Sequence, residues 1–379
     1  MLAVGETALR AFGAKTYYVW PPRLHQELHP SPRIMPGVSG ASRFAVSSLG
    51  LRGDEISPDR DVRILALGGS TTECLYLDQL EAWPRLLQER LGPRVWVGNA
   101  GKSGLHTRHH RLQAETLLDQ LPRMAAVIVL TGVNDLSVRL AQDTAWRPVD
   151  FTSPEAVRPL IREAFEVHPP RLAAGAFYQR TALHEALEMF NRRLRSGGAT
   201  QDVDGRRYVV WRRHRREAPV VRQRLPDLAP ALSEFAANLR AIAGSVTRHR
   251  ARIVFVTQPY LWRPDLPPEL QRLLWLGGVG RFQKEPGHEY YAVSALAAGL
   301  DAYNRTLLAT CRSLPGAVCV DLASELPKDT TVFYDDVHFN EAGARRVVAV
   351  LADQLRLRVS RAGRAATLPA RPAPTLGSN

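Results

Sequence analysis

Apolar residues in this chain come in short runs, and each run is followed by a polar or glycine-rich turn and then by a segment with helical spacing. Runs that are apolar at every position are typical of parallel strands buried on both faces of a sheet. Strands that alternate with helices form βαβ units, so we expect a five-stranded parallel sheet covered by helices on both faces. The expected strands are 64–67, 95–97, 126–130, 253–256 and 318–322, and the expected helices are 79–91, 107–120, 229–248, 297–312 and 340–356.

The two ends of the chain differ from this alternating body, which we place at residues 61–358. Residues 1–60 contain many prolines and aromatic residues but little periodicity, so we expect an arm that packs on the body. Residues 359–379 carry prolines among alanines and arginines, a composition that favours a disordered tail.

Two insertions interrupt the body. About 120 residues separate the third expected strand from the fourth, which is far more than one crossover helix needs. We expect a largely helical insertion at about 140–250, with helices at 181–195 and 229–248, and a shorter insertion at 262–296. The shorter one contains aromatic residues that could form a substrate wall or pack in the core, namely Trp262, Trp275, Phe282, Tyr290 and Tyr291.

The longer insertion is rich in arginine. Either it is a solvated helical cap, or it covers the functional site and favours anionic substrates or an anionic surface. The arginines concerned are Arg192, Arg193, Arg195, Arg206, Arg207, Arg212, Arg213, Arg215 and Arg216.

The overall charge is strongly positive, with a formal net charge of +13 and a pI of about 10.2. Nearly all of it comes from arginine, because lysine occurs only at residues 15, 102, 284 and 328. Such a bias through the whole chain does not define a binding surface, and no nucleic-acid recognition motif accompanies it. We therefore expect no nucleic-acid partner.

The cysteines and the N-terminus bear on the compartment. No apolar run has the length of a membrane span, and the N-terminus lacks the regions of a signal peptide, which predicts a cytoplasmic protein. If residues 2–13 are the end of a truncated anchor, an extracytoplasmic or membrane-anchored protein is the alternative. Cys74, Cys311 and Cys319 have no metal-ligand spacing. Cys311 and Cys319 could pair in an exported protein, but the odd count favours free, buried thiols.

Polar segments follow the first three expected strands, and a fourth precedes the last helix. In parallel α/β sheets the active site lies beyond the carboxyl ends of the strands, so we expect these segments to meet there. The segments are Gly68-Gly69-Ser70-Thr71, Asn99-Ala100-Gly101-Lys102-Ser103-Gly104, Thr131-Gly132-Val133-Asn134-Asp135 and Asp335-Asp336-Val337-His338.

Ser70 is the candidate nucleophile. The two preceding glycines allow a sharp turn that exposes the hydroxyl at the start of a helix, where N–H groups face a developing anion. The alternative is a capping box between Ser70 and Glu73, which would make the serine a structural N-cap. A phosphate-binding loop is disfavoured, because no Gly-Lys-Ser or Gly-Lys-Thr occurs.

His338 and Asp335 share one loop and suit a general base and the acid that orients it. Asp336 is the competing acid, although the three-residue spacing favours Asp335. The alternative is a surface loop ahead of a helix capped by Asn340. A metal site lacks a second histidine or cysteine at suitable spacing, so we expect neither a metal nor a cofactor.

Gly104 and Asn134 are candidate donors to an oxyanion, through a backbone N–H and a side-chain amide. Each also has an ordinary interpretation as turn or cap chemistry. The histidines His106, His109 and His110 at the start of a helix are expected at the surface. His106 and Arg108 could still contact the substrate beside Gly104, as Trp262 could from the shorter insertion.

The order of the four segments resembles the SGNH hydrolases, also called the GDSL esterase/lipase superfamily, over about 63–356. The family's usual Gly-Asp-Ser is here Gly-Gly-Ser, a variant familiar among bacterial members. Gly104 matches the usual spacing from Asn99, with Gly101 as the fallback. The segment Ser48-Leu49-Gly50-Leu51-Arg52-Gly53 also resembles the lead-in of bacterial members.

The resemblance implies a flavodoxin-like three-layer α/β/α fold and a serine esterase. It makes Ser70 the nucleophile, His338 the base and Asp335 the orienting acid, with an oxyanion hole formed by Ser70, Gly104 and Asn134. The substrate would be a carboxylic ester with a short acyl or O-acetyl group, with a carbohydrate as one source of the alcohol. The alternatives are an O-acyltransferase with the same triad and a non-catalytic module that binds polyanions.

Overall fold

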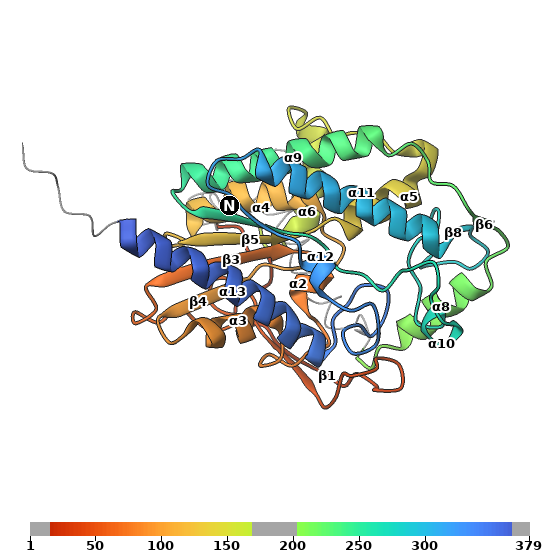
Figure 1. The fold of residues 1–379 in the computed structure, drawn as a ribbon, viewed down its shortest axis with the longest axis horizontal. Helices are drawn as coiled ribbons and strands as arrows, with labels where there is room; N and C mark the ends of the chain where they lie inside the picture. Colours follow the sequence, from red (N-terminus) through yellow and green to blue (C-terminus); the bar gives the residue numbers. More distant parts are fainter. Residues whose placement is uncertain (1–15, 169–202, 366–379) are drawn as a thin grey trace, which may run out of the picture.

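The computed structural model describes residues 16–168 and 203–365, and its centre is a five-stranded parallel sheet (Figure 1). The strand order β4-β3-β5-β7-β9 is the order 2-1-3-4-5 of flavodoxin-like folds. This confirms the predicted fold class. All five expected strands are present, as β3 (Val62–Gly68), β4 (Val95–Asn99), β5 (Ala126–Leu130), β7 (Arg252–Val256) and β9 (Val318–Val320).

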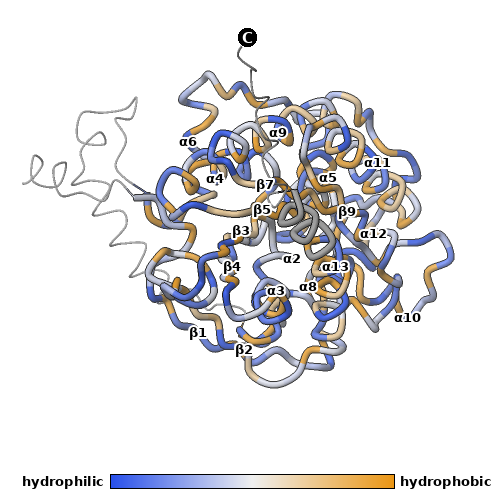
Figure 2. The backbone as a smooth tube through the Cα atoms, turned by 60° about the vertical axis from the view of Figure 1, so that its left-hand side comes forward, coloured by the Kyte–Doolittle hydropathy of each residue, from blue (hydrophilic) through white to orange (hydrophobic). Residues whose placement is uncertain are grey.

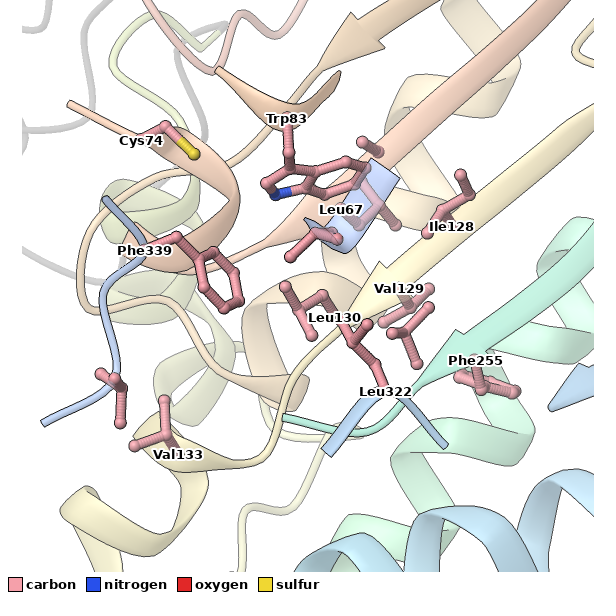
Figure 3. Packing of buried hydrophobic residues seen from close by; sticks show 14 of the residues in the cluster. Leu67, Cys74, Trp83, Ile128, Val129, Leu130, Val133, Phe255, Leu322 and Phe339 are labelled. Carbon is pink, nitrogen blue, oxygen red and sulfur yellow. The ribbon is translucent and has the colours of Figure 1, made fainter. Parts of the chain in front are cut away.

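The strands lie inside the molecule because both faces of the sheet are covered. Every residue of β4 and β5 is buried. In Figure 3, Val129 and Leu130 of β5 lie between Leu67 of β3 and Phe255 of β7, where the three strands pair. A run that is apolar at every position therefore has a packing partner on both faces.

Helices form the two outer layers (Figure 1). On one face, α3 (Trp83–Leu91) packs against α13 (Glu341–Ala365). On the other face, α9 (Ala229–Arg248) packs against both α4 (Thr107–Gln120) and α11 (Val293–Arg312). Hydrophobic and hydrophilic residues alternate along these helices, as Figure 2 shows.

The position of α9 corrects the expected extent of the first insertion. We expected α9 to belong to the insertion at 140–250, but it contacts β7 and lies in the outer layer as the crossover helix between β5 and β7. The inserted segment starts after α5 (Val133–Gln142) and its short 3₁₀ turn (Asp143–Ala145), and it includes α6 (Pro154–Ala164). The expected helix at 181–195 lies outside the described residues.

The two insertions meet at one end of the molecule. The first continues with α8 (Arg206–Arg216) and β6 (Val221–Arg222). The second contains α10 (Pro268–Gln271) and β8 (Tyr290–Tyr291). Because β6 pairs with β8, both insertions form one structure beside the carboxyl ends of the sheet strands (Figure 1).

The N-terminal part contains an antiparallel pair, β1 (His25–Leu28) with β2 (Ser42–Ala45). Further along, Arg52 exchanges backbone hydrogen bonds with Asn99 at the end of β4. At the other terminus α13 continues to Ala365, beyond its expected end at residue 356. The outer parts of the expected arm and tail, residues 1–15 and 366–379, lie outside the described residues. No helix of the described part is both long and apolar enough to cross a bilayer.

The expectation of three free thiols is wrong for two of them. Cys311 in the last turn of α11 and Cys319 in β9 form a disulfide, with their Cα atoms 5.8 Å apart. The turn between helix and strand folds back so that the two side chains face each other, which eight residues of separation did not reveal. Cys74 is free and buried, as expected.

Candidate active site

The turn that carries Ser70 lies against the segments that follow β4 and β5. Ser70 opens the short helix α2 (Ser70–Glu73) directly after β3. A side chain at Gly69 would collide with the amide of Asn134 and would lie 3.0 Å from the carbonyl oxygen of Leu105. A larger residue here would have to displace the Asn134 amide, so Gly69 allows the three segments to pack this closely.

Ser70, His338 and Asp335 form a continuous chain of hydrogen bonds. The Ser70 hydroxyl lies 2.7 Å from Nε2 of His338, and Nδ1 of His338 lies 2.7 Å from Oδ2 of Asp335. The other carboxylate oxygen, Oδ1, accepts the backbone N–H groups of Val337 and His338 at 3.0 and 2.8 Å. The serine hydroxyl thus faces the histidine, and no capping box with Glu73 forms, because Gly69 is the N-cap of α2.

The two adjacent aspartates point to different partners. Asp336 accepts the indole N–H of Trp262 at 2.8 Å and the backbone N–H of Trp275 at 2.7 Å, whereas Asp335 faces His338. Both carboxylates are fully buried. Burial and the charge of Asp335 raise the pKa of Asp336 to about 6. Asp336 therefore anchors the second insertion, and Asp335 is the acid in contact with the histidine.

The electrostatics of the pair favour a protonated histidine next to an ionised acid. Burial alone would lower the pKa of His338, but the charge and hydrogen bond of Asp335 outweigh it and raise this pKa above its ordinary value. For Asp335, burial acts to raise the pKa, and the opposing interactions with His338 and Trp275 leave it lowered. This arrangement stabilises the imidazolium that forms when a histidine accepts a proton.

Gly104 and Gly101 differ in their surroundings. A side chain at Gly101 would collide with the backbone of Thr72 and Glu73, so this glycine serves close packing. Gly104 has a φ of 81° and open space where a side chain would be, and it is exposed. Its backbone therefore lies beside free space at the site, which favours Gly104 over Gly101 as a donor to a bound oxygen.

Asn134 lies between the serine turn and the Gly104 loop. Its amide donates to the carbonyl of Leu105 at 2.8 Å, and this bond fixes the side-chain orientation. An amide nitrogen has two N–H groups, so the second remains for another acceptor. Asn134 is half-buried, and the exposed Gly104 directly precedes the Leu105 to which Asn134 bonds.

Aromatic residues from both insertions surround His338. The ring of Trp275 is stacked parallel to that of His338 at 6.4 Å, and its indole N–H donates to Asp335 at 2.9 Å. Tyr208 of α8 meets His338 edge to face at 6.1 Å, and Tyr334 stacks on it at 5.5 Å. The sequence indicated Trp275 only as one of several aromatic residues of the second insertion. Tyr208 was not predicted, because it lies in an arginine-rich segment that indicated a charged surface.

A buried arginine and a half-buried arginine of α8 join the first insertion to the loops around the site. Arg212 donates to the carbonyls of Ile34, Leu273 and Tyr334, the last of which directly precedes Asp335. Arg215 donates to the carbonyls of Leu276 and Tyr291. These two guanidinium groups bind backbone rather than solvent, so the first insertion is not simply a solvated cap.

The three residues expected to contact the substrate are all buried. Trp262 is only 1% exposed and bonds to Asp336, so it packs beneath the loop. Arg108 pairs with Glu234 at 2.8 and 2.7 Å, and it lines a small cavity together with His106. The expectation of surface histidines is also wrong, since His106, His109 and His110 are all buried. His110 shares one helix face with Ala114, Leu117 and Leu118, so the apolar spacing of this helix could have indicated its burial.

Comparison with known proteins identifies the family. Residues 66–346 match the profile of the GDSL-like lipase/acylhydrolase family. No curated protein has a significant match to the sequence. Among solved structures, the chain is similar to Axe2, an acetylxylan esterase from Geobacillus stearothermophilus (14% identity, 78% of this chain and 94% of that chain, TM-score 0.40). It is also similar to a carbohydrate acetylesterase family member from Sinorhizobium meliloti (12% identity, 79% of this chain and 99% of that chain, TM-score 0.41). On the extent of the profile match, the chain belongs to the GDSL-like lipase/acylhydrolase family and is a hydrolase that acts on ester bonds.

Proposed function

We propose that the protein is a serine esterase that hydrolyses a carboxylic ester through an acyl-enzyme on Ser70. The observation that carries the proposal is the chain of two 2.7 Å hydrogen bonds from Ser70 through His338 to Asp335. Such a chain gives a hydroxyl the base that it needs to act as a nucleophile at neutral pH.

In the first half of the reaction, the Ser70 oxygen bonds to the ester carbonyl carbon while its proton passes to Nε2 of His338. The resulting oxyanion accepts hydrogen bonds from the backbone N–H groups of Ser70 and Gly104 and from the amide of Asn134. The intermediate then collapses, and the leaving alcohol takes the proton from His338. The acyl group remains on the serine.

In the second half, His338 removes a proton from water, which attacks the acyl-enzyme. A second oxyanion forms in the same place, and its collapse returns the proton to Ser70 and releases the carboxylic acid. Asp335 stays ionised throughout and stabilises the imidazolium. Every proton transfer runs through Nε2 of His338, whose contact with Ser70 is already made in the free protein.

For the substrate, we propose a short acyl or O-acetyl ester, with a carbohydrate as one source of the alcohol. The acetyl esters that the similar Geobacillus and Sinorhizobium enzymes are named for motivate this choice. Initial rates on nitrophenyl esters of increasing acyl length, with acetylated xylan beside them, test it. Highest turnover on acetyl esters is expected, and a maximum at long acyl chains would contradict the proposed acyl group.

Active-site labelling tests the nucleophile independently of the substrate. A fluorophosphonate probe should label the wild-type protein, and labelling should be lost in Ser70→Ala. Ser48→Ala is a suitable control, because the Ser48 hydroxyl bonds to Glu55 and not to a histidine, so this variant should label like the wild type. Labelling of Ser70→Ala at the wild-type rate would overturn the assignment of the nucleophile.

A further inference from the structure

The exposed apolar side chains of the protein are concentrated in one short stretch. Only seven large apolar side chains of the described residues are markedly exposed, and five of them lie between residues 203 and 221. Each of the five is between 40% and 49% exposed, although valine is normally buried. They are Val203, Val209, Val210, Val220 and Val221.

The same stretch is strongly basic. Between residues 203 and 222 the chain has seven arginines but only two acidic residues, Asp204 and Glu217. The four arginines in the second half of α8 fall into two groups. Arg212 and Arg215 bind carbonyls inside the protein, while Arg213 and Arg216 are exposed. We call the exposed residues Val209, Val210, Arg213, Arg216, Val220 and Val221 the α8 surface.

A groove of about 380 Å³ adjoins this surface. It lies between α8, β6, α10 and β8, at the end of the molecule where the two insertions meet (Figure 1). Arg216 and the exposed Arg272 provide positive charge at the groove, and its apolar walls are Val221, Leu274 and Val293. Arg216 and Val221 belong both to the groove and to the α8 surface, so the two features are continuous.

We propose that the α8 surface docks on a membrane containing anionic phospholipids and that the adjoining groove takes one lipid molecule. Exposed valines enter the boundary between headgroups and acyl chains, and arginines bind the phosphates. In the groove, Arg216 and Arg272 face the phosphate, while the apolar walls contact the rest of the lipid.

Apolar and basic groups occur together here, which is the reason to choose a lipid surface over a soluble polyanion. A polyanion in water would bind the arginines, but it would not bury the four exposed valines of the α8 surface or the apolar wall of the groove. The inner side of α8 contacts the candidate active site through Tyr208 and Arg212. Docking would therefore hold that site close to the membrane. The proposal itself rests on the surface and not on the proposed esterase function.

Vesicle co-sedimentation of the full chain tests the proposal. The protein is mixed with vesicles of phosphatidylcholine alone, or of phosphatidylcholine with about a third phosphatidylglycerol, at low salt and at about 0.15 M salt. We expect binding to the anionic vesicles, weaker binding at the higher salt and little binding to the neutral vesicles. The pair R213E/R216E should weaken it by roughly ten-fold or more. The pair V209S/V210S should also weaken it, with the net charge unchanged.

A matched control is R240E/R312E, which makes the same change of charge on exposed residues of α9 and α11. This control should retain most of the binding, and thermal unfolding should show that all variants are folded. Three results would overturn the proposal. The first is absence of binding to anionic vesicles at low salt. The second is an equal loss of vesicle binding in the control and in the α8 variants. The third is vesicle binding that V209S/V210S leaves unchanged and that dextran sulfate abolishes by competition. The last result would show a polyanion site instead.

Discussion

Trp275 and Asp335 are joined by a hydrogen bond of 2.9 Å from the indole N–H to Oδ2, the carboxylate oxygen that also accepts Nδ1 of His338. The backbone N–H of the same tryptophan holds Asp336 at 2.7 Å. Trp275 of the second insertion thus donates to both adjacent carboxylates, through its indole to Asp335 and through its backbone to Asp336. This arrangement leads to two predictions about the acid side of the site.

The first prediction concerns which aspartate supports the histidine. Asp335→Asn should lower kcat by roughly 10²–10⁴, because the imidazolium loses its charged partner and the tautomer of the ring is no longer fixed. Asp336→Asn, the matched variant on the next residue, should keep most of the activity. Its charge acts to raise the pKa of His338, so removing it should move the acidic limb of the kcat/KM profile to lower pH. Equal losses in both variants would contradict the division of roles.

The second prediction concerns Trp275 itself. Trp275→Phe removes one donor to Asp335 and leaves the backbone bond to Asp336 in place. The carboxylate then holds the histidine proton more strongly, so the pKa of His338 should rise. Because His338 acts as a base only when neutral, activity is lost as pH falls through this pKa. The acidic limb should therefore move to higher pH, with kcat reduced more than KM changes. A purely structural role would lower thermal stability without moving the limb.

Asn134 provides a test of the oxyanion site. Asn134→Ala removes an N–H donor aimed at the charge that develops in the transition state, so kcat should fall by roughly 10²–10³ with KM little changed. Ser137→Ala, on the next turn of α5, is the control and should behave like the wild type. A loss confined to KM in steady-state kinetics would show that Asn134 binds substrate instead.

The arginines of α8 provide a test of stability. Arg212→Met leaves three carbonyls without their donor, one of them buried and two half-buried, which should lower the free energy of unfolding by roughly 2–4 kcal/mol. Arg213→Met changes the exposed neighbour and should stay within about 0.5 kcal/mol of the wild type. Urea denaturation of the two variants makes the comparison. Equal stabilities would mean that Arg212 does not hold the loops together.

The sequence was sufficient for features that depend on local pattern. Fully apolar runs predicted all five strands of the sheet, because a strand buried on both faces has no polar position. The three-residue spacing of Asp335 and His338 predicted their contact, because a short loop brings such neighbours together. The position of Ser70 after the first strand predicted that it would meet them, because the carboxyl ends of parallel strands share one edge of the sheet.

Contacts between distant segments could not be predicted in this way. Trp275 and Tyr208 reach His338 from two insertions without a regular pattern, and nothing in either segment marks these two aromatic residues among the others. Trp262 looked like a substrate residue because it follows a strand, but its partner is a buried carboxylate. Arg108 is buried and forms an ion pair with Glu234, which lies more than a hundred residues away in the sequence. The sequence of the helix that contains Arg108 does not indicate this partner.

The central claim is that Ser70 carries the acyl group during turnover, and mass spectrometry of the protein during hydrolysis of nitrophenyl acetate tests it most directly. Rapid acid quenching in the steady state, followed by peptide mapping, should find one acetyl group on the peptide that contains Ser70. Ser70→Ala should show neither the adduct nor the turnover. Wild-type turnover in Ser70→Ala, or an acetyl group found on another residue in the active wild-type enzyme, would contradict the account.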